Sequence, residues 1–333
     1  MNNTNRCVGL VGTGYWGKNL LRNFEGLAAL AGFFDISAEN QTHYGALYPG
    51  AKIFTSYEAL LADADISAVA IATPAATHGD LVARALRAGK HVFVEKPLCL
   101  NVSEAEKLKK IADEKSLVLM VGHLLLYHPA FWALIETVKK QRLGKLRYIY
   151  SNRLSLGKIR REENALWSFA PHDISMILQL AGELPRRVIA SGAHFLTDGV
   201  VDTTLSHLVF NNNLQAHIYV SWLHPFKEQK LVVVGEKAMI VFDDTKDPAE
   251  KLLLYRHKVE WDGEIPVVSK AEPEPLAFDV GEPLRNECQA FLDAVKGISR
   301  PPSDAAEGIR VLRVLEACQQ SMQKGAAIDV VPR

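Results

Sequence analysis

Three glycines and an aspartate near the start of the chain have the spacing of a phosphate-binding turn. Gly12, Gly14 and Gly17 form a G-x-G-x-x-G pattern between an apolar run, residues 6–11, and an amphipathic helical pattern. A second apolar run ends in Asp35, about 20 residues after the glycines. This order predicts a dinucleotide site, where free N–H groups at the helix start bind the pyrophosphate and the aspartate binds the adenine ribose.

Each position of this turn has a separate physical task. Gly12 allows the tight turn, Gly14 lets the backbone approach the pyrophosphate, and Gly17 lets helix and strand pack closely. The Asp35 carboxylate would repel a 2′-phosphate, and residues 36–37 contain no arginine that could pair with one. We therefore expect NAD rather than NADP. A glycine-rich turn without a ligand is the alternative, and the flanking strand, helix and acid argue against it.

A lysine follows another apolar run. Residues 91–94 are expected to form a buried strand, and Glu95, Lys96 and Pro97 come directly after it. Because open α/β sheets bind ligands outside the carboxyl ends of their strands, Lys96 is expected at the cofactor crevice. There it could hold a substrate oxygen and stabilise a developing alkoxide. Taken alone, a lysine at a strand end is normally a solvated charge.

The segment Thr73–His78 ends a third strand-like run. Its simplest interpretation is a turn with a helix cap at Thr77, and its functional interpretation places Thr73 and Pro74 against the cofactor. The two interpretations are compatible.

Two histidines, His123 and His128, stand five residues apart without nearby acids. That spacing makes a poor metal site, so we expect hinge and packing residues and no bound metal.

Strands and helices alternate through the first third of the chain. This alternation predicts a doubly wound parallel sheet that ends near residue 122. The expected strands are 6–11, 30–34, 66–72, 91–94 and 117–121, and the clearest helices are 78–88 and 105–115.

After residue 122 the pattern changes to strand-like runs with few intervening helices. It predicts an antiparallel open sheet with one face covered by helices. We therefore expect an α/β Rossmann domain over 1–122 and an α+β domain over 123–333, with a long excursion at 243–282. The expected helices are 129–140, 173–180, 283–295 and 304–323, and the expected strands are 146–151, 188–192, 203–210, 215–222, 229–235 and 238–242.

Composition excludes several classes of protein. The 333 residues include equal numbers of basic (38) and acidic (38) residues, so global charge favours neither nucleic acid nor a membrane as partner. The first five residues are polar and no apolar stretch is long enough to span a bilayer, so we expect no signal peptide and a cytoplasmic protein. The four scattered cysteines contain no C-x-x-C pair and are expected to be reduced.

Together these motifs resemble the Gfo/Idh/MocA family of NAD(P)-dependent oxidoreductases. The resemblance rests on the glycine turn, T-P-x-x-x-H at 73–78, E-K-P at 95–97 and the antiparallel domain, and the segments 283–287 and 305–320 are similar to the family's C-terminal pattern. It implies that the lysine of E-K-P sits beside the nicotinamide and the substrate hydroxyl. The expected cofactor contacts are Gly12, Thr13, Gly14, Tyr15, Trp16, Asp35, Thr73, Pro74, His78, Glu95, Lys96 and Trp167.

The family's second catalytic element is usually D-x-x-x-H. Here His172 fits the histidine, and Ser168 stands where the aspartate would be. Pro171 is expected to begin a helix, whose N-terminus would disfavour the imidazolium and keep His172 able to accept a proton. The resemblance thus implies Lys96 and His172 as the catalytic pair, and a structural cap is the alternative for the histidine.

Basic residues are frequent between residues 147 and 163, a segment expected to border the crevice between the domains. They would suit an anionic substrate such as a nucleotide-sugar pyrophosphate, and a solvated charged face is the alternative. Tyr148 and Tyr150 alternate on the preceding strand, and Trp167 suits either a sugar contact or the core. The expected substrate contacts are Lys96, Tyr150, Arg153, Lys158, Arg160, Asn164 and His172.

Within the family, the segments 122–129, 152–160 and 164–173 resemble the branch that oxidises UDP-N-acetylglucosamine or its uronic acid at C3. That resemblance implies a 3-keto sugar used by an aminotransferase for lipid A or surface polysaccharide, and a homodimer or homotetramer. Two alternatives stay open: oxidation of a free polyol such as inositol, which the basic segment disfavours, and a non-catalytic NAD-binding regulator, which would need neither Lys96 nor His172.

Overall fold

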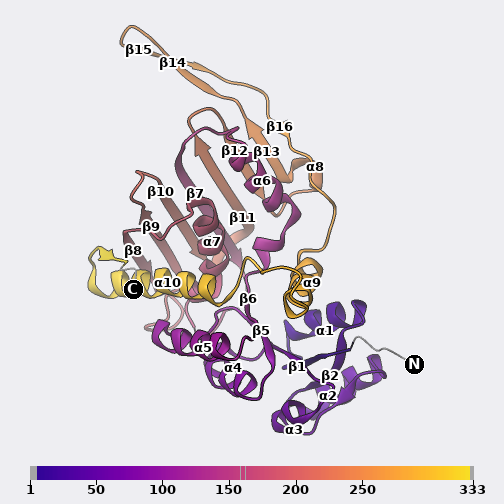
Figure 1. Ribbon diagram of the computed structural model, residues 1–333. Coiled ribbons are helices and arrows are strands. Elements are labelled where there is room, and N and C mark those ends of the chain that lie inside the picture. Colours follow the sequence, from indigo (N-terminus) through magenta and orange to yellow (C-terminus); the bar gives the residue numbers. More distant parts are fainter. Residues whose placement is uncertain (1–5, 158, 162, 331–333) are drawn as a thin grey trace. The chain divides into compact units, whose positions relative to one another are not determined.

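The computed structural model describes residues 6–157, 159–161 and 163–330 (Figure 1). The chain forms two compact units, each made of two separate stretches of sequence. The first unit contains the chain up to Tyr127 together with Gly281–Leu312. The second contains His128–Val280 and the chain from Arg313 onward. The division expected at 122/123 thus differs from the structure, because Gly281–Leu312 packs with the N-terminal unit.

The first unit contains a six-stranded parallel sheet in the order β3-β2-β1-β4-β5-β6. Every residue of β1, β4 and β6 is buried, which explains why these strands appear in the sequence as continuous apolar runs. The strands are β1 Val8–Val11, β2 Leu30–Phe34, β3 Lys52–Ile53, β4 Ala68–Ile71, β5 His91–Glu95 and β6 Leu119–Gly122. The predicted Rossmann sheet is confirmed.

Helices connect these strands, and one further helix comes from the C-terminal part of the sequence. They are α1 Gly17–Gly26, α2 Ala38–Leu47, α3 Tyr57–Ala62, α4 His78–Arg87, α5 Val102–Glu114, α9 Pro283–Val295 and the 3-10 helices η1 Ala75–Thr77 and η2 Leu124–Tyr127. Helix α9 belongs to this core because Phe291 stacks edge-on with Phe24 of α1 and Phe93 of β5, at centroid distances of 6.3 and 5.8 Å.

The second unit contains a nine-stranded sheet in the order β16-β13-β12-β11-β7-β10-β9-β8-β17. Strand β7 lies between β11 and β10 and runs parallel to β10, so this largely antiparallel sheet is not the simple meander that the sequence predicted. The strands are β7 Leu146–Leu156, β8 Arg187–Ala193, β9 Thr203–Val209, β10 Gln215–Ser221, β11 Leu223–Gly235, β12 Met239–Asp243, β13 Leu252–Tyr255, β16 Glu274–Pro275 and β17 Ile328–Asp329.

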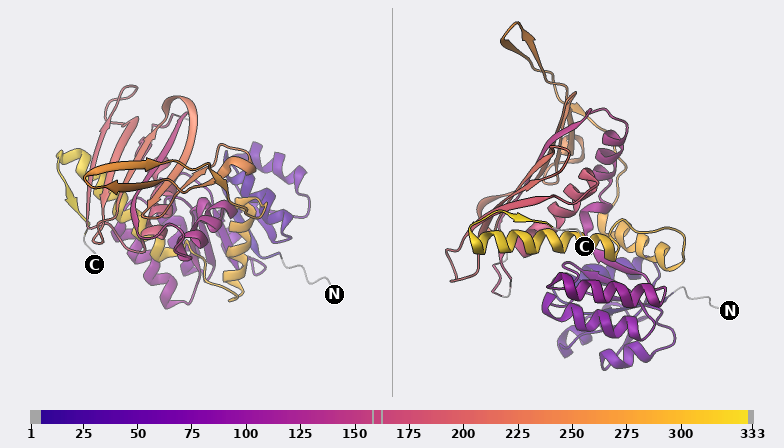
Figure 2. Two further views of the ribbon diagram at one scale, coloured as in Figure 1. Left: turned by 90° about the horizontal axis from the view of Figure 1, so that it is seen from above. Right: turned by 60° about the vertical axis from the view of Figure 1, so that its left-hand side comes forward.

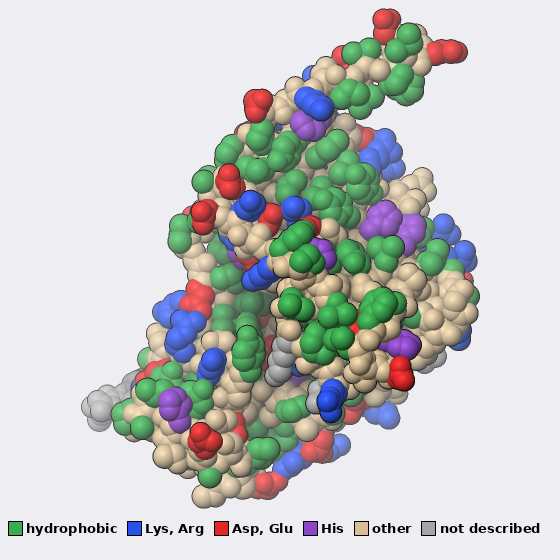
Figure 3. Space-filling model, turned by 180° about the vertical axis from the view of Figure 1, so that it is seen from behind, with side chains coloured by type: hydrophobic (Ala, Val, Ile, Leu, Met, Phe, Trp, Pro, Cys, Tyr) green, Lys and Arg blue, Asp and Glu red, His purple; other side chains and the backbone are tan. Residues whose placement is uncertain are grey.

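Helices cover one face of this sheet. Helix α7, Ala165–Ala181, packs against β7, β9 and β10, and α6, Pro129–Lys139, packs against β12 (Figure 2). Helix α10, Ala305–Lys324, contributes its last part to this unit. Hydrophobic side chains remain exposed on the other face of the sheet: Tyr148, Ile189, Leu205 and Tyr219. Figure 3, which views the molecule from behind, shows that hydrophobic side chains gather on that surface.

The excursion predicted for residues 243–282 contains regular structure. A short helix, α8 Pro248–Lys251, precedes β13, and the strands β14, Lys258–Asp262, and β15, Ile265–Ser269, form a hairpin that projects from the sheet of this unit (Figures 1 and 2). Every residue of the two hairpin strands is exposed. Their register places Val259 opposite Val268 and Trp261 opposite Pro266, so one face of the hairpin is entirely apolar.

Among the described residues, none of the helices combines the length and the apolar character needed to cross a membrane.

Candidate functional site

The glycines of the N-terminal turn occupy positions that side chains would disturb. Gly12 has a φ of +87°, and a Cβ on Gly17 would lie 1.9 Å from the carbonyl oxygen of Gly12. Nothing lies within 4 Å of the position that a Cβ on Gly14 would take, so a ligand can approach the backbone there. The turn therefore has the geometry expected of a pyrophosphate site. Tyr15 is 73% exposed, and its ring lies 5.7 Å from the Lys18 ammonium.

Asp35 is buried at the end of β2 and joins the glycine turn. One carboxylate oxygen accepts hydrogen bonds from Thr13 N (2.6 Å) and Thr13 Oγ1 (2.8 Å), and the other accepts one from Ser37 N (2.8 Å). Burial alone would raise the pKa of Asp35, but the hydrogen bonds from Ser37 and Thr13 outweigh it and lower that pKa. Asp35 is therefore ionised at neutral pH and holds the turn in place.

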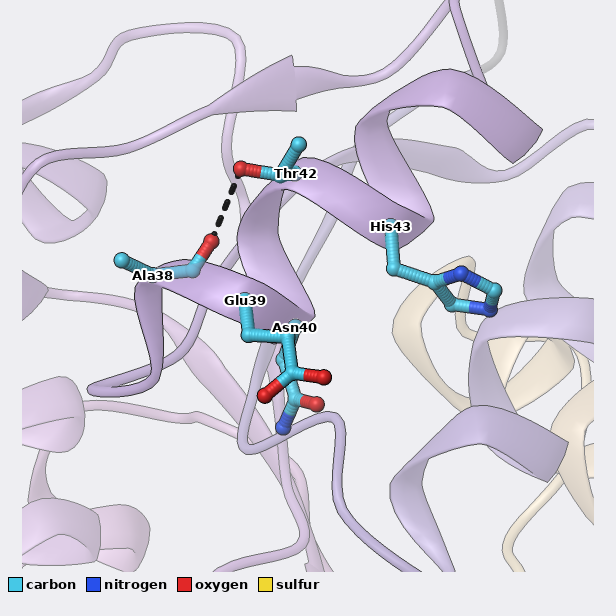
Figure 4. Close-up of a pocket in the computed structure, with 5 residues that line it drawn as sticks. All are labelled: Ala38, Glu39, Asn40, Thr42 and His43. Atoms are coloured by element: carbon cyan, nitrogen blue, oxygen red, sulfur yellow. Dashed lines mark hydrogen bonds between the residues drawn. The ribbon is translucent and has the colours of Figure 1, made fainter.

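Beside Asp35, helix α2 carries a hollow of about 660 Å³ (Figure 4). Its side chains diverge: Thr42 bonds back to the carbonyl of Ala38 (2.9 Å), Glu39 and Asn40 lie together below the helix, and His43 points to one side. Because the hollow is lined by a single exposed helix and Thr42 is turned back to its own backbone, we assign this hollow no role.

The turn after β4 and the E-K-P turn after β5 are joined by one histidine. The two ring nitrogens of His78 lie 2.7 Å from the Pro97 carbonyl oxygen and 2.9 Å from the Thr73 carbonyl oxygen. Thr73 Oγ1 also hydrogen-bonds to Thr77 Oγ1 (2.7 Å). His78 is buried, and the Lys96–Pro97 peptide bond is cis. The structure thus places Thr73, His78 and the E-K-P turn at the ends of two neighbouring strands, β4 and β5.

Glu95 connects the E-K-P turn to the glycine turn. Its carboxylate accepts a hydrogen bond from Trp16 Nε1. Desolvation raises the pKa of Glu95 to about 7, although the positive charge of Lys96 and the Trp16 hydrogen bond both act to lower it. Lys96, which is half-buried, is therefore the next residue in the sequence after Glu95, an acid whose pKa lies near neutrality.

His172 lies inside α7 rather than at its start. The helix begins at Ala165, where Asn164 caps it by accepting a hydrogen bond from Trp167 N (3.2 Å), and Pro171 lies within it. The predicted start at Pro171 was wrong, because the buried residues of the first two turns add a continuous apolar face that outweighs the cost of an interior proline. The argument that a helix N-terminus keeps His172 neutral therefore does not apply.

Arg153, expected to bind the substrate, is held by Asp173 instead. Arg153 Nε donates to Asp173 Oδ2 (2.7 Å) and Nη2 donates to Oδ1 (3.2 Å), while Ser151 Oγ donates to Asp173 Oδ1 (2.5 Å). The Arg153 and Asp173 side chains are 10% and 1% exposed. This buried ion pair links β7 to α7 next to His172. Because its guanidinium is already paired, Arg153 is unsuited to bind a phosphate.

Tyr150 lies on the other face of the sheet. Residues on β7 alternate, so Ile149, Ser151 and Arg153 face α7, whereas Tyr148, Tyr150 and Asn152 face away from it. The expected alternation of the two tyrosines is correct, but it separates Tyr150 from His172. The sequence could not show this, because the period of a strand does not tell which face the helices cover.

The other expected substrate contacts have varied surroundings. The Asn164 amide caps α7 and donates to Gln319 Oε1 (2.9 Å), so its polar atoms are already used. Arg160 is partly exposed and pairs with Glu163 (3.0 Å). Trp167 is half-buried in the first turn of α7. Lys158 lies outside the described residues.

The two histidines that were expected to act as packing residues make structural contacts. His123 Nδ1 lies 2.6 Å from Glu307 Oε2 in the interior of the first unit. His128 caps α6 by accepting from Ala130 N (3.0 Å), and its Nε2 lies 3.3 Å from Asp244 Oδ1. Within the described ranges, no three histidine, cysteine or acidic residues are arranged to hold a metal.

The buried acids that the sequence interpretation did not single out include Asp173 and Glu287. Asp173 directly follows His172, and Glu287 lies one helical turn before the core residue Phe291. A charged residue on the apolar face of a predicted helix was the signal for Glu287, since such residues are rarely buried without a reason.

Two dehydrogenases are similar to this chain, one over nearly its whole length and the other over little more than half. A UDP-N-acetylglucosamine 3-dehydrogenase from Acidithiobacillus ferrooxidans is 29% identical over 308 residues, 92% of this chain and 93% of that protein. Its solved structure superposes with a TM-score of 0.83 at 27% identity, over 95% and 97% of the two chains. An inositol 2-dehydrogenase from Rhizobium meliloti is 31% identical over 204 residues, 58% of this chain and 60% of that protein.

A solved structure of a putative oxidoreductase from Magnetospirillum magnetotacticum is 32% identical, with a TM-score of 0.82 over 94% and 99% of the two chains. Two family models match: an oxidoreductase family with an NAD-binding Rossmann fold over residues 6–123, and the GFO/IDH/MocA C-terminal domain over residues 131–241. With its glycine turn, its E-K-P strand end and its open second sheet, this chain belongs to the Gfo/Idh/MocA family of oxidoreductases.

Proposed function

We propose that this protein oxidises the C3 hydroxyl of a UDP-linked N-acetylamino sugar, UDP-N-acetylglucosamine in the first instance, with NAD as the oxidant. The observation that carries the proposal is the match to a UDP-N-acetylglucosamine 3-dehydrogenase over nine-tenths of both chains. The product would be a 3-keto sugar nucleotide. Such a ketone is the substrate that an aminotransferase needs to make a 3-amino sugar for lipid A or surface polysaccharide.

The residues of the first unit fit a dinucleotide. The open backbone at Gly14 suits the pyrophosphate, and the Asp35 carboxylate suits the ribose hydroxyls. NAD, when bound, supplies the hydride acceptor. Lys96 would donate a hydrogen bond to the substrate oxygen and stabilise the negative charge that grows there as the C–H bond breaks.

We assign the removal of the hydroxyl proton to His172, acting as general base. The Arg153–Asp173 pair holds the neighbouring backbone of α7 on the sheet, which supports a fixed position for the imidazole. His172 and Lys96 belong to different units, so kinetics of their variants must test whether they act on one substrate.

The preference for NAD over NADP follows from Asp35. Its pKa is lowered, so it carries a full negative charge where a 2′-phosphate would bring two more. Of the three basic residues of the segment 147–163 expected as substrate contacts, Arg153 is buried in an ion pair and Lys158 lies outside the described residues. Arg160 is partly exposed, and we propose it as the phosphate contact.

A second candidate function is oxidation of a free polyol. The match to an inositol 2-dehydrogenase over 204 residues favours it specifically. This substrate carries no phosphate, so substitution of Arg160 would leave its oxidation unchanged.

The deciding experiment mixes the purified protein with NAD and either UDP-N-acetylglucosamine, its uronic acid, or inositol, and follows NADH absorbance with and without 2-oxoglutarate. Growth of NADH with one UDP-sugar supports the proposal and identifies the group at C6. A weaker NADH signal with 2-oxoglutarate, together with greater consumption of the sugar and formation of 2-hydroxyglutarate, indicates that bound NADH is reoxidised in place. NADH formation with inositol alone establishes the second candidate, and NAD binding without turnover favours a non-catalytic regulator.

We also propose a homo-oligomer. The exposed apolar residues on the outer sheet face and on the β14–β15 hairpin support it, because such surfaces commonly mark protein interfaces. Sedimentation equilibrium of the purified chain tests this, and a monomer at micromolar concentration would refute it.

A further inference from the structure

Two histidines lie side by side on the outer sheet face of the second unit, the face that α7 does not cover. His217 of β10 is directly opposite His207 of β9 in the antiparallel register. The next pair along the two strands, Ser206 and Ile218, is buried on the side of α7, so the two histidines point the other way. Their ring centroids are 4.7 Å apart, and the ring planes differ by 33°. The sheet therefore fixes two imidazoles as neighbours.

The hydrogen bond of His207 determines which of its nitrogens could bind a ligand. His207 Nε2 lies 2.8 Å from Gln215 Oε1. Because an amide oxygen only accepts hydrogen bonds, Nε2 carries the proton, and Nδ1 of the neutral ring keeps a lone pair. Histidines that bind metals usually donate their other N–H to an oxygen in this way, which fixes the tautomer and the orientation of the ring.

His217 is exposed, and neither of its ring nitrogens is hydrogen-bonded within the part of the chain that the structure describes. Partial burial and the neighbouring His207 lower the pKa of His217, so its imidazole is neutral at pH 7. A metal ion binds the neutral ring, because the protonated ring has no lone pair to offer.

The residues directly beside the two histidines favour one class of ion. Tyr150 of β7 lies next to His217, and Ile189 of β8 lies next to His207. Neither carries a carboxylate, so Ca²⁺ and Mg²⁺, which need several oxygen ligands, are disfavoured. Imidazole nitrogens suit Cu²⁺, Ni²⁺ and Zn²⁺, and of these Cu²⁺ is bound most tightly.

We propose that His207 and His217 together bind one divalent transition-metal ion, Cu²⁺ most tightly, with water as the remaining ligands. Metal–nitrogen distances of about 2.0–2.1 Å require the two ligating nitrogens to lie about 3 Å apart. Rotation of the exposed His217 side chain brings them to that separation from the present ring spacing of 4.7 Å. Two side chains and water agree with the finding that no three metal-binding residues cluster within the described ranges.

This site is separate from the proposed catalytic residues of the second unit, because α7, which contains His172, covers the opposite face of the sheet. A bound ion would link β9 to β10 by a second kind of contact, in addition to their backbone hydrogen bonds.

The test adds Cu²⁺ alone to the full-length protein and to H207N and H217N. H43N, at an exposed histidine of α2, is the matched control. Electron spin-echo envelope modulation of the first equivalent of Cu²⁺ counts the imidazoles bound to it, and isothermal titration gives the dissociation constant. The wild type and H43N should bind one ion per chain through two imidazoles. H207N and H217N should show at most one imidazole and bind at least about tenfold more weakly.

A wild-type spectrum with a single imidazole would overturn the proposal, and so would wild-type affinity in H207N and H217N. One ion shared by two chains would contradict a site within one chain. If a variant does not fold, the wild-type spectrum still counts the imidazoles. As a second measurement, Zn²⁺ should raise the Tm of the wild type and of H43N, because a ligand of the folded state stabilises it, and an equal rise in H207N or H217N would also overturn the proposal. The measurement needs neither NAD nor a sugar, so its outcome is independent of the proposed function.

Discussion

The two units position their polar groups by different means. In the first unit, Asp35 and Glu95 both stand at carboxyl ends of strands in one parallel sheet, and each contacts a residue of the glycine turn. In the second unit, Asp173 and Asp244 are held by side chains from elements far apart in sequence. Backbone geometry thus places the groups of the first unit, and packing places those of the second.

The comparison of Asp35 with Glu95 explains why two strand ends of the same sheet carry acids with different properties. Asp35 accepts two backbone N–H bonds, and its pKa is lowered in spite of burial. Glu95 accepts one side-chain bond from Trp16, and desolvation raises its pKa to about 7. The number of donors that reach a buried carboxylate decides its charge at neutral pH. One acid can serve as a permanent anion, and the other can respond to pH.

The largest effect is expected for the catalytic pair. K96M and H172A should each lower kcat with the UDP-sugar by about 10²- to 10⁴-fold, because each removes a group that acts in the transition state. Stopped-flow or steady-state NADH formation measures the loss, and NADH binding should persist in both variants. K110M, at an exposed lysine of α5, is the matched control and should leave kcat unchanged. Full activity of K96M would contradict the assigned role.

The next effect concerns the buried pair of the second unit. D173N leaves the Arg153 guanidinium buried without its counter-charge, so the free energy of unfolding should fall by about 3 kcal/mol. Urea denaturation measures it. D329N is a close control, since the exposed Arg187–Asp329 pair has the same Nε–Oδ distance of 2.7 Å. That variant should show no measurable change, and an equal loss in both would show that burial is not the cause.

A smaller, pH-dependent effect is expected at Asp244. Burial opposes its ionisation, but His128 and Lys251 lower its pKa from 3.8 to about 2. An acid with a lowered pKa in the folded protein stabilises the fold above the unfolded value and loses that contribution as pH falls toward about 2. D244N should therefore reduce the free energy of unfolding by about 2 kcal/mol at neutral pH. The difference from wild type should disappear near pH 2, and a constant difference would refute the linkage.

The smallest effect is expected at Asp35. D35A should weaken NAD binding about tenfold, roughly 1.4 kcal/mol, and should weaken NADP binding less, because the repulsion of the 2′-phosphate is removed together with the ribose contact. Isothermal titration with both cofactors gives the ratio. An unchanged preference for NAD in D35A, or a wild-type preference for NADP, would show that selectivity lies elsewhere.

Short-range patterns were sufficient for the N-terminal stretch of the first unit, up to residue 122. The glycine turn, the buried strands and the E-K-P turn depend on contacts between residues near each other in sequence or on strand ends that a parallel sheet must align. Gly17 has to be glycine because of a backbone oxygen five residues away. The five predicted strands up to residue 122 are therefore confirmed, and so are the family and its fold class, whereas β3 and the helices α2 and α3 were not predicted.

Tertiary packing decided the rest. Helix α7 begins at Ala165 because its first turns bury apolar residues against the sheet, which the local signal of Pro171 could not reveal. The face on which Tyr150 lies, and the partner that occupies Arg153, depend on which side of β7 receives α7.

Helix α9 joins the first unit through Phe291, almost 200 residues after β5, and buries Glu287 in the interior of that unit. The sequence alone determines which residues could bind a dinucleotide, because those requirements are local. Only the folded chain determines which acids are desolvated and which arginines are already paired, because desolvation and ion pairing arise from contacts between distant segments.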